Sequence, residues 1–288
     1  MEFEFNLENN IFQLYQDLKN KSYKHSDYTS FYVQDPKIRH IHKAIVRDRI
    51  IHHLISKYLE QIYDKIFIFD SYSCRINKGT HKAVNRLKQF SLKQNNSNKT
   101  NFCCLKCDIK KFFNSIDHEI LIEILKRKIK DRDILNLIHE IIDSFQITKS
   151  KGIPLGNLTS QYFANIYLNE LDQFIKHKLR VKYYIRYTDD FVILERNKDY
   201  LENIIIPINR FLRNELKLSL HPDKIIIRKY NQGIDFLGYI TLPHCRVLRT
   251  KTKIRMLRRI NQKNLQSYLG ILRHCCGYKL GKKIFKII

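Results

Sequence analysis

The sequence is poor in acidic residues, and this shortage is its strongest compositional signal. Across 288 residues, 28 Asp and Glu stand against 53 Lys and Arg, which gives a formal net charge of +25. Such an excess favours a polyanionic partner, either a nucleic acid or an anionic membrane surface. The length suffices for one large domain or two to three small ones, and 43% hydrophobic residues suffice for a sizeable core.

Long apolar runs are also missing. No run approaches the ~20 residues that a membrane-spanning helix needs. The opening segment, MEFEFNLENN, lacks the basic region and apolar core of a secretory signal. We therefore expect a cytoplasmic protein with no membrane partner, which leaves nucleic acid as the favoured polyanion.

The seven cysteines do not suit a disulfide framework, because their number is odd and no signal peptide precedes them. Cys104 and Cys107 form a CxxC pair, and His274, Cys275 and Cys276 lie far downstream. A zinc site from these residues is an open but weak alternative, since no second spaced pair completes a four-ligand set. The run FCCLKC equally fits cysteines that act as small buried hydrophobes.

From Cys245 onward the chain has no Asp or Glu but thirteen Lys and Arg. An apolar stripe accompanies them, formed by Ile254, Leu257, Ile260 and Leu265. A helix with one apolar and one basic face fits docking against a core while lying on phosphates. A solvated surface helix usually mixes both signs of charge. We therefore expect this segment to bind nucleic acid.

Hydrophobic periodicity and turn residues predict an α+β domain with an antiparallel sheet. A first helix within residues 1–20 should pack on the core, and the Asn-rich stretch 91–101 should be a linker. Ser115 or Asp117 could cap the helix that follows the first strand. The remaining expected elements are a strand at 102–109, helices at 118–130, 158–179 and 201–216, a loop at 151–157, and strands at 224–228 and 235–241.

Two adjacent carboxylates stand out in the run YYIRYTDDFVIL. Apolar, β-forming stretches flank Asp189 and Asp190, which predicts a tight hairpin with both residues at its turn. Two like charges there cost stability unless a cation offsets them. Mg²⁺ prefers oxygen ligands and is the natural candidate. Asp-Asp is also a common turn pair, so this run alone leaves both interpretations open.

A third carboxylate, Asp108, closes the apolar strand of LKCDIKKFFNSIDH. A strand-end acid beside the hairpin could complete a three-carboxylate cluster. Two metals about 4 Å apart, held by such a cluster, are the recurring arrangement for in-line phosphoryl transfer. The acids therefore favour nucleotidyl-transfer chemistry.

Several runs resemble, in order and spacing, the motifs of reverse transcriptases. The palm-like runs are LKCDIKKFFNSIDHEIL, GIPLGNLTSQYFANIYLNELD, YYIRYTDDFVIL, LSLHPDKIIIRKY and DFLGYI. DPKIRHIHKAIVRDRIIHHLI and YSCRINKGTHKAV resemble bacterial finger motifs, and SYLGILRHCCGY resembles the start of a thumb. The resemblance implies an α+β right-hand polymerase. Its domains would be fingers at 1–100, a palm at 101–243 that includes part of the fingers (about 130–157), and a short basic helical thumb at 244–288.

The resemblance also implies an RNA-directed DNA polymerase and its catalytic residues. Asp108, Asp189 and Asp190 match the metal-binding triad, which would hold two Mg²⁺ ions, with Mn²⁺ able to substitute. Lys224 matches the lysine that protonates the leaving pyrophosphate, a use that suits a movable acid. A surface charge is the alternative role for Lys224.

The matching nucleotide-binding residues are Lys37, Arg39, Phe113, Leu155, Gly156 and Gln161. Phe113 matches the steric gate that excludes a ribose 2′-hydroxyl, although it could instead be a core Phe beside Phe112. The primer-grip match is Phe236, Leu237, Gly238 and Tyr239. In the thumb-like segment, the residues expected on the template–primer backbone are Arg255, Arg258, Arg259 and Lys263. Tyr187 should support the hairpin and the primer end.

The form IPLGNLTSQ carries Leu155 and Gln161 where most reverse transcriptases have Gln and Pro. This form resembles the reverse transcriptases of diversity-generating retroelements, which copy a template RNA with frequent errors at adenines for mutagenic retrohoming. A Gln there can hydrogen-bond and check geometry, whereas Leu has no donor, and polar contacts usually discriminate more strongly than apolar ones. Leu155 could also be only a loop packing residue.

The implied partners are a template RNA, the cDNA or primer, dNTPs and a small basic accessory protein of the retroelement. A retron-type or antiphage-defence reverse transcriptase is the alternative within the enzyme class. A catalytically silent RNA-binding scaffold is the alternative outside it, and the three intact aspartates count against that.

Overall fold

The computed structural model describes residues 2–34, 37–95 and 102–285. The chain forms two compact units, each assembled from three stretches. The first unit comprises Met1–Ile68, Ile109–Lys178 and Ile208–Leu220, and the second comprises Phe69–Asp108, Leu179–Pro207 and His221–Ile288. The chain crosses from the second unit to the first directly after Asp108.

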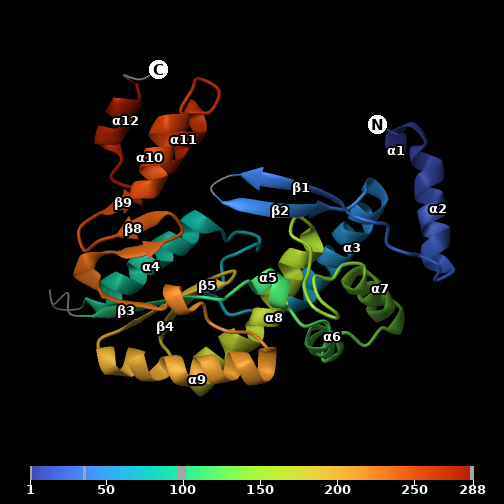
Figure 1. Cartoon of the computed structure of the whole chain (residues 1–288), viewed down its shortest axis with the longest axis horizontal. Helices are drawn as coiled ribbons and strands as arrows, with labels where there is room; N and C mark the ends of the chain where they lie inside the picture. The colour runs from blue at the N-terminus through green and yellow to red at the C-terminus, as the bar shows by residue number, and fades with distance from the viewer. Residues whose placement is uncertain (1, 35–36, 96–101, 286–288) are drawn as a thin grey trace. The chain divides into compact units, whose positions relative to one another are not determined.

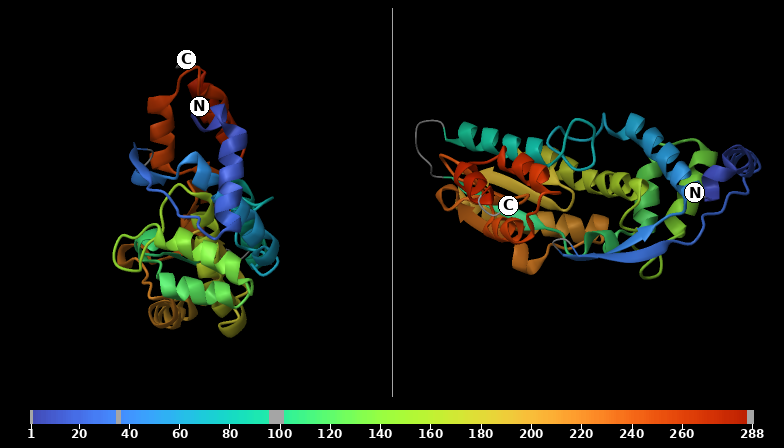
Figure 2. Two further views of the ribbon diagram at one scale, coloured as in Figure 1. Left: turned by 90° about the vertical axis from the view of Figure 1, so that its right-hand side faces the viewer. Right: turned by 90° about the horizontal axis from the view of Figure 1, so that it is seen from above.

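The first unit is mainly helical and carries one two-stranded hairpin, visible as a long ribbon in Figure 2 (right). The hairpin strands are β1 (Thr29–Gln34) and β2 (Ile38–Lys43). Its helices are α1 (Glu2–Phe5), α2 (Leu7–Lys19), α3 (Val46–Tyr63), α5 (Phe112–Ser115), α6 (His118–Lys126), α7 (Arg132–Asp143) and α8 (Leu158–Gln173), which continues into a π-helical turn, Phe174–Lys178. The largely buried α8 packs against α3 and α6 (Figure 1).

The start of α6 follows the expected capping chemistry. The Asp117 side chain accepts a hydrogen bond of 3.3 Å from the Ile120 amide, which confirms one of the two predicted caps. The N-terminal helix differs from the prediction, because in α2 only Leu14 is buried. Most of its apolar side chains are exposed, so it does not pack on the core along a whole face: Leu7, Ile11, Phe12 and Tyr15.

The second unit is built on a four-stranded antiparallel sheet in the order β4-β5-β3-β6 (Figure 1). These strands are β3 (Cys103–Asp108), β4 (Tyr183–Tyr187), β5 (Asp190–Glu195) and β6 (Ile226–Lys229). A smaller sheet contains β7 (Ile234–Phe236), β8 (Tyr239–Thr241) and β9 (Arg246–Leu248). Helix α4 (Thr80–Gln94) packs against β4 and β5. Its buried residues, such as Leu87 and Phe90, share a core with Ile185, Val192 and Leu194.

Several segments differ from the predicted elements. The helix predicted at 118–130 ends at Lys126, and the strand predicted at 224–228 is β6, which a 3-10 turn, Pro222–Lys224, precedes. Residues 91–94 end α4 and are not linker, while 96–101 lie outside the described residues. Helix α9 (Lys198–Leu216) begins earlier than predicted, so Pro207 lies in its interior. The predicted strand 235–241 is a hairpin, because Leu237 (φ +52°) and Gly238 (φ +87°) turn the chain between β7 and β8.

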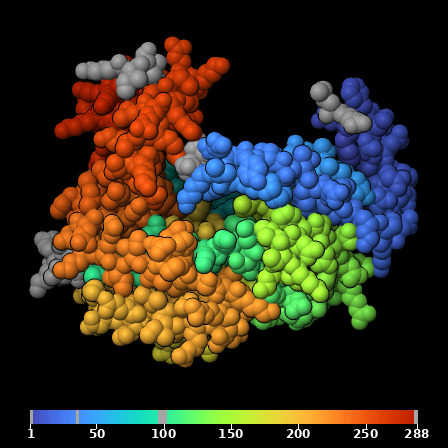
Figure 3. Space-filling view, viewed as in Figure 1, coloured from blue at the N-terminus to red at the C-terminus, as the bar shows by residue number. Residues whose placement is uncertain are grey.

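The C-terminal segment is helical as predicted, with α10 (Thr250–Arg259), α11 (Leu265–Leu272) and α12 (Tyr278–Ile284). Figure 3 shows this segment in orange to red. The buried position of α10 is Met256, whereas Ile254 of the predicted stripe is 44% exposed. Arg246 is buried and donates hydrogen bonds to Asn85 and to backbone carbonyls, so it serves packing and not phosphate binding.

No helix among the described residues has the length and apolar character that crossing a membrane requires.

Candidate active site

The acidic pair lies where β4 returns into β5. Tyr187 pairs with Asp190 across this hairpin, which leaves Thr188 and Asp189 as the turn. Asp190 is therefore the first residue of β5, not a turn residue as predicted. A strand position fixes its backbone by the ladder and directs its side chain to one face of the sheet.

Strand β3 brings the third acid to the same place. In the antiparallel register of β3 and β5, Asp108 lies directly opposite Asp190. Residues opposite each other on neighbouring strands have their Cβ atoms ~5 Å apart. The prediction that the strand-end Asp108 lies beside the hairpin is confirmed.

Ser73 and Arg186, which the sequence analysis did not single out, hold the turn through Thr188. Thr188 has φ +52°, which is costly for a β-branched residue. Its hydroxyl bonds the Ser73 hydroxyl at 2.7 Å, and the fully buried Arg186 donates to the Thr188 carbonyl at 3.0 Å. Arg186 also donates to the Ser71 hydroxyl at 3.2 Å. The signal for Arg186 was a lone Arg inside the apolar strand YYIRY.

Two lysines neutralise the carboxylates. Lys224 Nζ lies 2.6 Å from Asp108 Oδ1, and Lys106 Nζ lies 3.2 Å from Asp190 Oδ2. The structure thus brings the predicted Lys224 to the acids. Lys106 was missed, although alternation gave the signal: it is two residues before Asp108 on β3, so both side chains share one face.

Asp190 is only partly satisfied. Burial raises the pKa of its carboxyl to about 6, and the neighbouring Lys106 ammonium opposes this shift. Its Oδ1 atom is buried and has no hydrogen-bond partner. A buried carboxylate oxygen without a donor carries an electrostatic cost that a bound cation would remove.

The donor chemistry fits a hard cation such as Mg²⁺, because carboxylate oxygens from two strands adjoin and one of them has no hydrogen-bond partner. Within the described ranges, no three or more acidic, His or Cys side chains are grouped closely enough to hold a metal ion. The Lys106 and Lys224 ammonium groups lie against the carboxylates instead. The assignment of Asp108, Asp189 and Asp190 as metal ligands stays a prediction.

The neighbouring cysteines have the character of small hydrophobes. Cys104 and Cys107 are buried in β3, and burial raises the pKa of both thiols, that of Cys107 to about 12. Zinc binds the thiolate, which this environment disfavours. The weak zinc alternative therefore finds no support in their surroundings.

The nucleotide-binding candidates belong to the first unit. Arg39 is exposed on β2, and Lys37 is exposed just before it. The Leu155 carbonyl accepts a hydrogen bond of 2.8 Å from the His42 amide, so the Leu155 loop docks on β2. Gly156 permits this approach, because it has φ +113° and a Cβ there would lie 2.6 Å from Ile41 Cγ2.

The other nucleotide-binding candidates of this unit are Phe113 and Gln161. Phe112 is buried, and Phe113 is half-buried with its ring edge-on to Phe112 at 5.4 Å between centroids. This difference favours Phe113 over Phe112 as the residue available to a ligand. The Phe113 carbonyl accepts the Ile153 amide at 2.9 Å. Gln161 is exposed on α8.

The primer-grip candidates divide into two pairs. Phe236 and Tyr239 are core residues, whereas Leu237 and Gly238 form a half-exposed turn. Only the turn pair is therefore available for contact. Among the thumb candidates Arg255 is half-buried, and three side chains are exposed: Arg258, Arg259 and Lys263.

Comparisons with known proteins identify the family of this chain. The family model "Reverse transcriptase (RNA-dependent DNA polymerase)" matches residues 24–241. Protein YkfC of Escherichia coli is 26% identical over 70% of this chain and 63% of its own length. The group II intron-encoded protein LtrA of Lactococcus lactis is 25% identical over 81% of this chain and 49% of its own length. The chain thus spans less than two thirds of these relatives.

A solved structure of telomerase from Candida albicans with a fragment of telomeric RNA superimposes with a TM-score of 0.59. It is 12% identical, and the match covers 93% of this chain and 57% of that one. This likeness concerns the fold, which is that of right-hand polymerases with mixed helices and sheets. The family match spans well over half of the chain and includes the Asp108, Asp189 and Asp190 positions, so the chain belongs to the reverse transcriptase family.

Proposed function

We propose that this protein is an RNA-directed DNA polymerase that copies a template RNA into cDNA. The observation that carries the proposal is the juxtaposition of Asp108 and Asp190 across β3 and β5, with one buried Asp190 oxygen lacking a partner. In a reverse transcriptase chain, such a position is where a phosphoryl-transfer cation would bind.

Each acid and lysine of the second unit has a role in this proposal. Two Mg²⁺ or Mn²⁺ ions held by Asp108, Asp189 and Asp190 would supply activation of the primer 3′-hydroxyl and stabilisation of charge on the phosphates. Lys224 would release Asp108 and donate a proton to the leaving pyrophosphate. Lys106 holds the Asp190 carboxylate in place through its 3.2 Å contact.

The remaining candidates bind substrates. Lys37 and Arg39 would hold the triphosphate of a dNTP, and Phe113 would exclude the ribose 2′-hydroxyl. The Leu237–Gly238 turn would support the primer end. The exposed Arg258, Arg259 and Lys263 would lie along the template–primer backbone, in keeping with the net charge of +25.

Primer extension on an RNA template tests the polymerase. Wild-type protein should extend a DNA primer only when Mg²⁺ or Mn²⁺ is present, and Asp189→Ala should not extend it. Asp223→Ala is the matched control, because Asp223 is an acid of the same unit with an 86% exposed side chain. If the wild type extended no primer with either metal but still bound RNA, only the catalytically silent RNA-binding scaffold would remain as its function.

We further propose that the enzyme is error-prone at template adenines and serves mutagenic retrohoming in a diversity-generating retroelement. The supporting observation is Leu155, whose backbone is fixed against β2 while its side chain offers no hydrogen-bond donor. Leu155→Gln should lower misincorporation at adenines on a defined template, and Leu155→Met should not, because Met adds no donor. Equal error rates in all three proteins would refute this role.

The partners separate this subclass from retron-type and antiphage-defence enzymes. A diversity-generating enzyme should copurify with a template-repeat RNA whose adenines coincide with variable sites, and with a small basic accessory protein. A copurified RNA without such a template repeat would instead favour a retron-type or antiphage-defence enzyme. Sequencing of the copurified RNA distinguishes these cases.

A further inference from the structure

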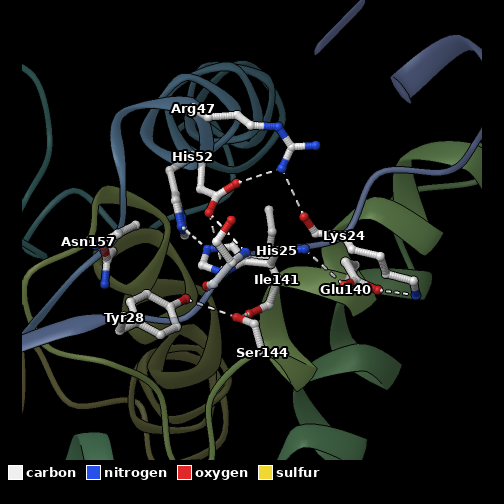
Figure 4. Close-up of polar contacts among 12 residues, drawn as sticks. Lys24, His25, Tyr28, Arg47, His52, Glu140, Ile141, Ser144 and Asn157 are labelled. Atoms are coloured by element: carbon white, nitrogen blue, oxygen red, sulfur yellow. Dashed lines mark hydrogen bonds and ion pairs between the residues drawn. The ribbon is translucent and has the colours of Figure 1, made fainter. Parts of the chain in front are cut away.

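A buried polar cluster in the first unit is not used by the proposed reaction (Figure 4). It lies at the base of the β1–β2 hairpin, and its members come from the segment before β1 and from α3 and α8. We call it the hairpin clamp, and it consists of Tyr23, His25, Asp48, His52 and Thr159. Three of these residues are at most 2% exposed: Asp48, His52 and Thr159.

Asp48 ties the segment before β1 to α3. Its side chain has no solvent exposure, and its oxygens accept from the Tyr23 hydroxyl at 2.8 Å and the Ser26 amide at 3.0 Å. Arg47 donates to the same carboxylate at 3.3 Å. A buried carboxylate with three donors is fully compensated, so it fixes the geometry of the groups that surround it.

A row of hydrogen bonds runs from α8 to the same segment. Thr159 Oγ1 lies 2.6 Å from His52 Nδ1, His52 Nε2 lies 3.0 Å from His25 Nε2, and His25 Nδ1 lies 2.6 Å from the Ser26 carbonyl. Burial lowers the pKa of His52 to about 4, which keeps that ring neutral at neutral pH.

The donors in this row follow by elimination for the tautomers in which each ring carries one hydrogen. The Ser26 carbonyl can only accept, so His25 Nδ1 carries the hydrogen and His25 Nε2 must accept. His52 then donates from Nε2 and accepts at Nδ1, and the Thr159 hydroxyl donates. Removal of the Thr159 hydroxyl therefore leaves the first acceptor of the row unpaired.

Both ends of the clamp meet the hairpin. The segment it holds continues into Tyr28, the residue before β1, whose hydroxyl lies 2.9 Å from the Ser144 hydroxyl. Thr159 follows Asn157 by two residues, and Asn157 Nδ2 donates to the His42 carbonyl of β2 at 2.8 Å. Figure 4 shows Tyr28, Ser144 and Asn157 around the two histidines.

An aromatic row supports the same geometry. The Phe145 ring packs edge-on to Tyr28 at 5.8 Å and contacts His42 of β2 at 4.6 Å. His42 in turn contacts His40, whose ring stacks on Tyr32 of the opposite strand at 4.5 Å. Packed rings transmit a shift at one end to the next, because close-packed contacts tolerate little displacement.

We propose that Thr159, acting through His52 and His25, is a positioning residue that sets the β1–β2 hairpin against the Leu155 loop and thereby the affinity for the incoming nucleotide. This inference rests on the proposed function, in which Arg39 of β2 and Leu155 contact that nucleotide. The clamp contacts neither the nucleotide nor the acids; it fixes the elements that carry the contacting residues.

Thr159→Val tests the inference, since Val keeps the shape and removes the hydroxyl. We expect the KM for dNTPs to rise about fivefold, which corresponds to the ~1 kcal/mol of one hydrogen bond. The kcat and the affinity for primer–template should stay at wild-type values. Thr159→Ser restores the hydroxyl and should restore the KM, a rescue that a general loss of packing would not show.

Ser91→Ala is the matched control. Ser91 is a fully buried hydroxyl of the second unit that donates to the Leu87 carbonyl at 2.9 Å. Its removal costs a buried hydroxyl hydrogen bond outside the clamp and should leave the dNTP KM unchanged. An equal rise in KM for Ser91→Ala would overturn the inference, because the effect would then be one of stability.

Hydrogen exchange of the backbone amides gives a second measurement that needs no activity. Amides of β1 and β2 should exchange faster in Thr159→Val than in wild type or Thr159→Ser. Unchanged hairpin exchange together with an unchanged KM would refute the clamp while leaving the polymerase intact. If wild-type protein did not extend primers, the proposed function would fail, and the exchange comparison would still decide whether the clamp holds the hairpin.

Discussion

Asp48 of the first unit is fully buried and Asp190 of the second is half-buried; both acids lie next to cationic side chains, yet their surroundings differ. Asp48 accepts hydrogen bonds from Tyr23, Ser26 and Arg47. Asp190 has Lys106 at one oxygen, while its other oxygen is buried without a partner. Burial raises the pKa of Asp190 to about 6. A satisfied acid stabilises the fold, and an unsatisfied one is retained where a ligand completes it.

The strongest test of this contrast removes the charge at Asp190. Asp190→Asn should lower primer-extension activity about a thousandfold, ~4 kcal/mol in the barrier, because an amide is a poor metal ligand. The free energy of unfolding in urea without metal should change by no more than about 1 kcal/mol, since the buried charge was costly. A large loss of stability would show that Asp190 is structural like Asp48.

The converse substitution is Asp48→Asn. The new amide would face the hydroxyl, amide and guanidinium donors that now bind the carboxylate, so we expect a loss of about 2–4 kcal/mol in unfolding free energy. The kcat of the folded fraction should stay near wild type. Urea denaturation with kinetics at matched folded fractions measures both, and a stable but inactive variant would place Asp48 in the chemistry.

The sequence predicted the surroundings of Asp190 better than those of Asp48. Asp108 and Asp190 were predictable as neighbours because strand ends and alternating apolar residues specify the face and edge of a sheet. Lys106 follows the same alternation, so its position on the face of Asp108 could also have been predicted. The hairpin of β7 and β8 was not, because Leu237 enters a left-handed conformation that its residue type does not signal.

Asp48 was hidden for a different reason. In the run AIVRDRI it has the appearance of an exposed acid between two arginines of a helix. Its hydrogen-bond donors include Tyr23 and Ser26, which lie 25 and 22 residues earlier in the chain. Local periodicity carries no information about such partners, so tertiary packing decided the role of this residue.

Acid should weaken the clamp through His52. Burial lowers the pKa of His52 to about 4, whereas an unfolded histidine titrates near 6.5. The unfolded state therefore binds the proton first, and the stabilising contribution is present above pH ~6.5 and is lost as the pH falls toward 4. The loss can reach about 3 kcal/mol. In His52→Gln, the free energy of unfolding in urea should decline less between pH 7.5 and 4.5 than in wild type. Equal declines in the two proteins would contradict the lowered pKa of His52.

Lys106 gives the smallest and most selective test, because it holds Asp190 at 3.2 Å and the Asp235 carbonyl of β7 at 2.9 Å. A cation that binds Asp190 must compete with this ammonium. Lys106→Gln should therefore lower the Mg²⁺ concentration for half-maximal extension by about threefold to tenfold, ~1 kcal/mol, while kcat also falls as the tie to β7 is lost. Lys106→Arg keeps the charge and should keep the wild-type Mg²⁺ requirement. If the glutamine variant changed stability alone, Lys106 would serve the fold, as Arg47 does beside Asp48, and the evidence for the site would rest on the unpartnered oxygen of Asp190 and its position opposite Asp108.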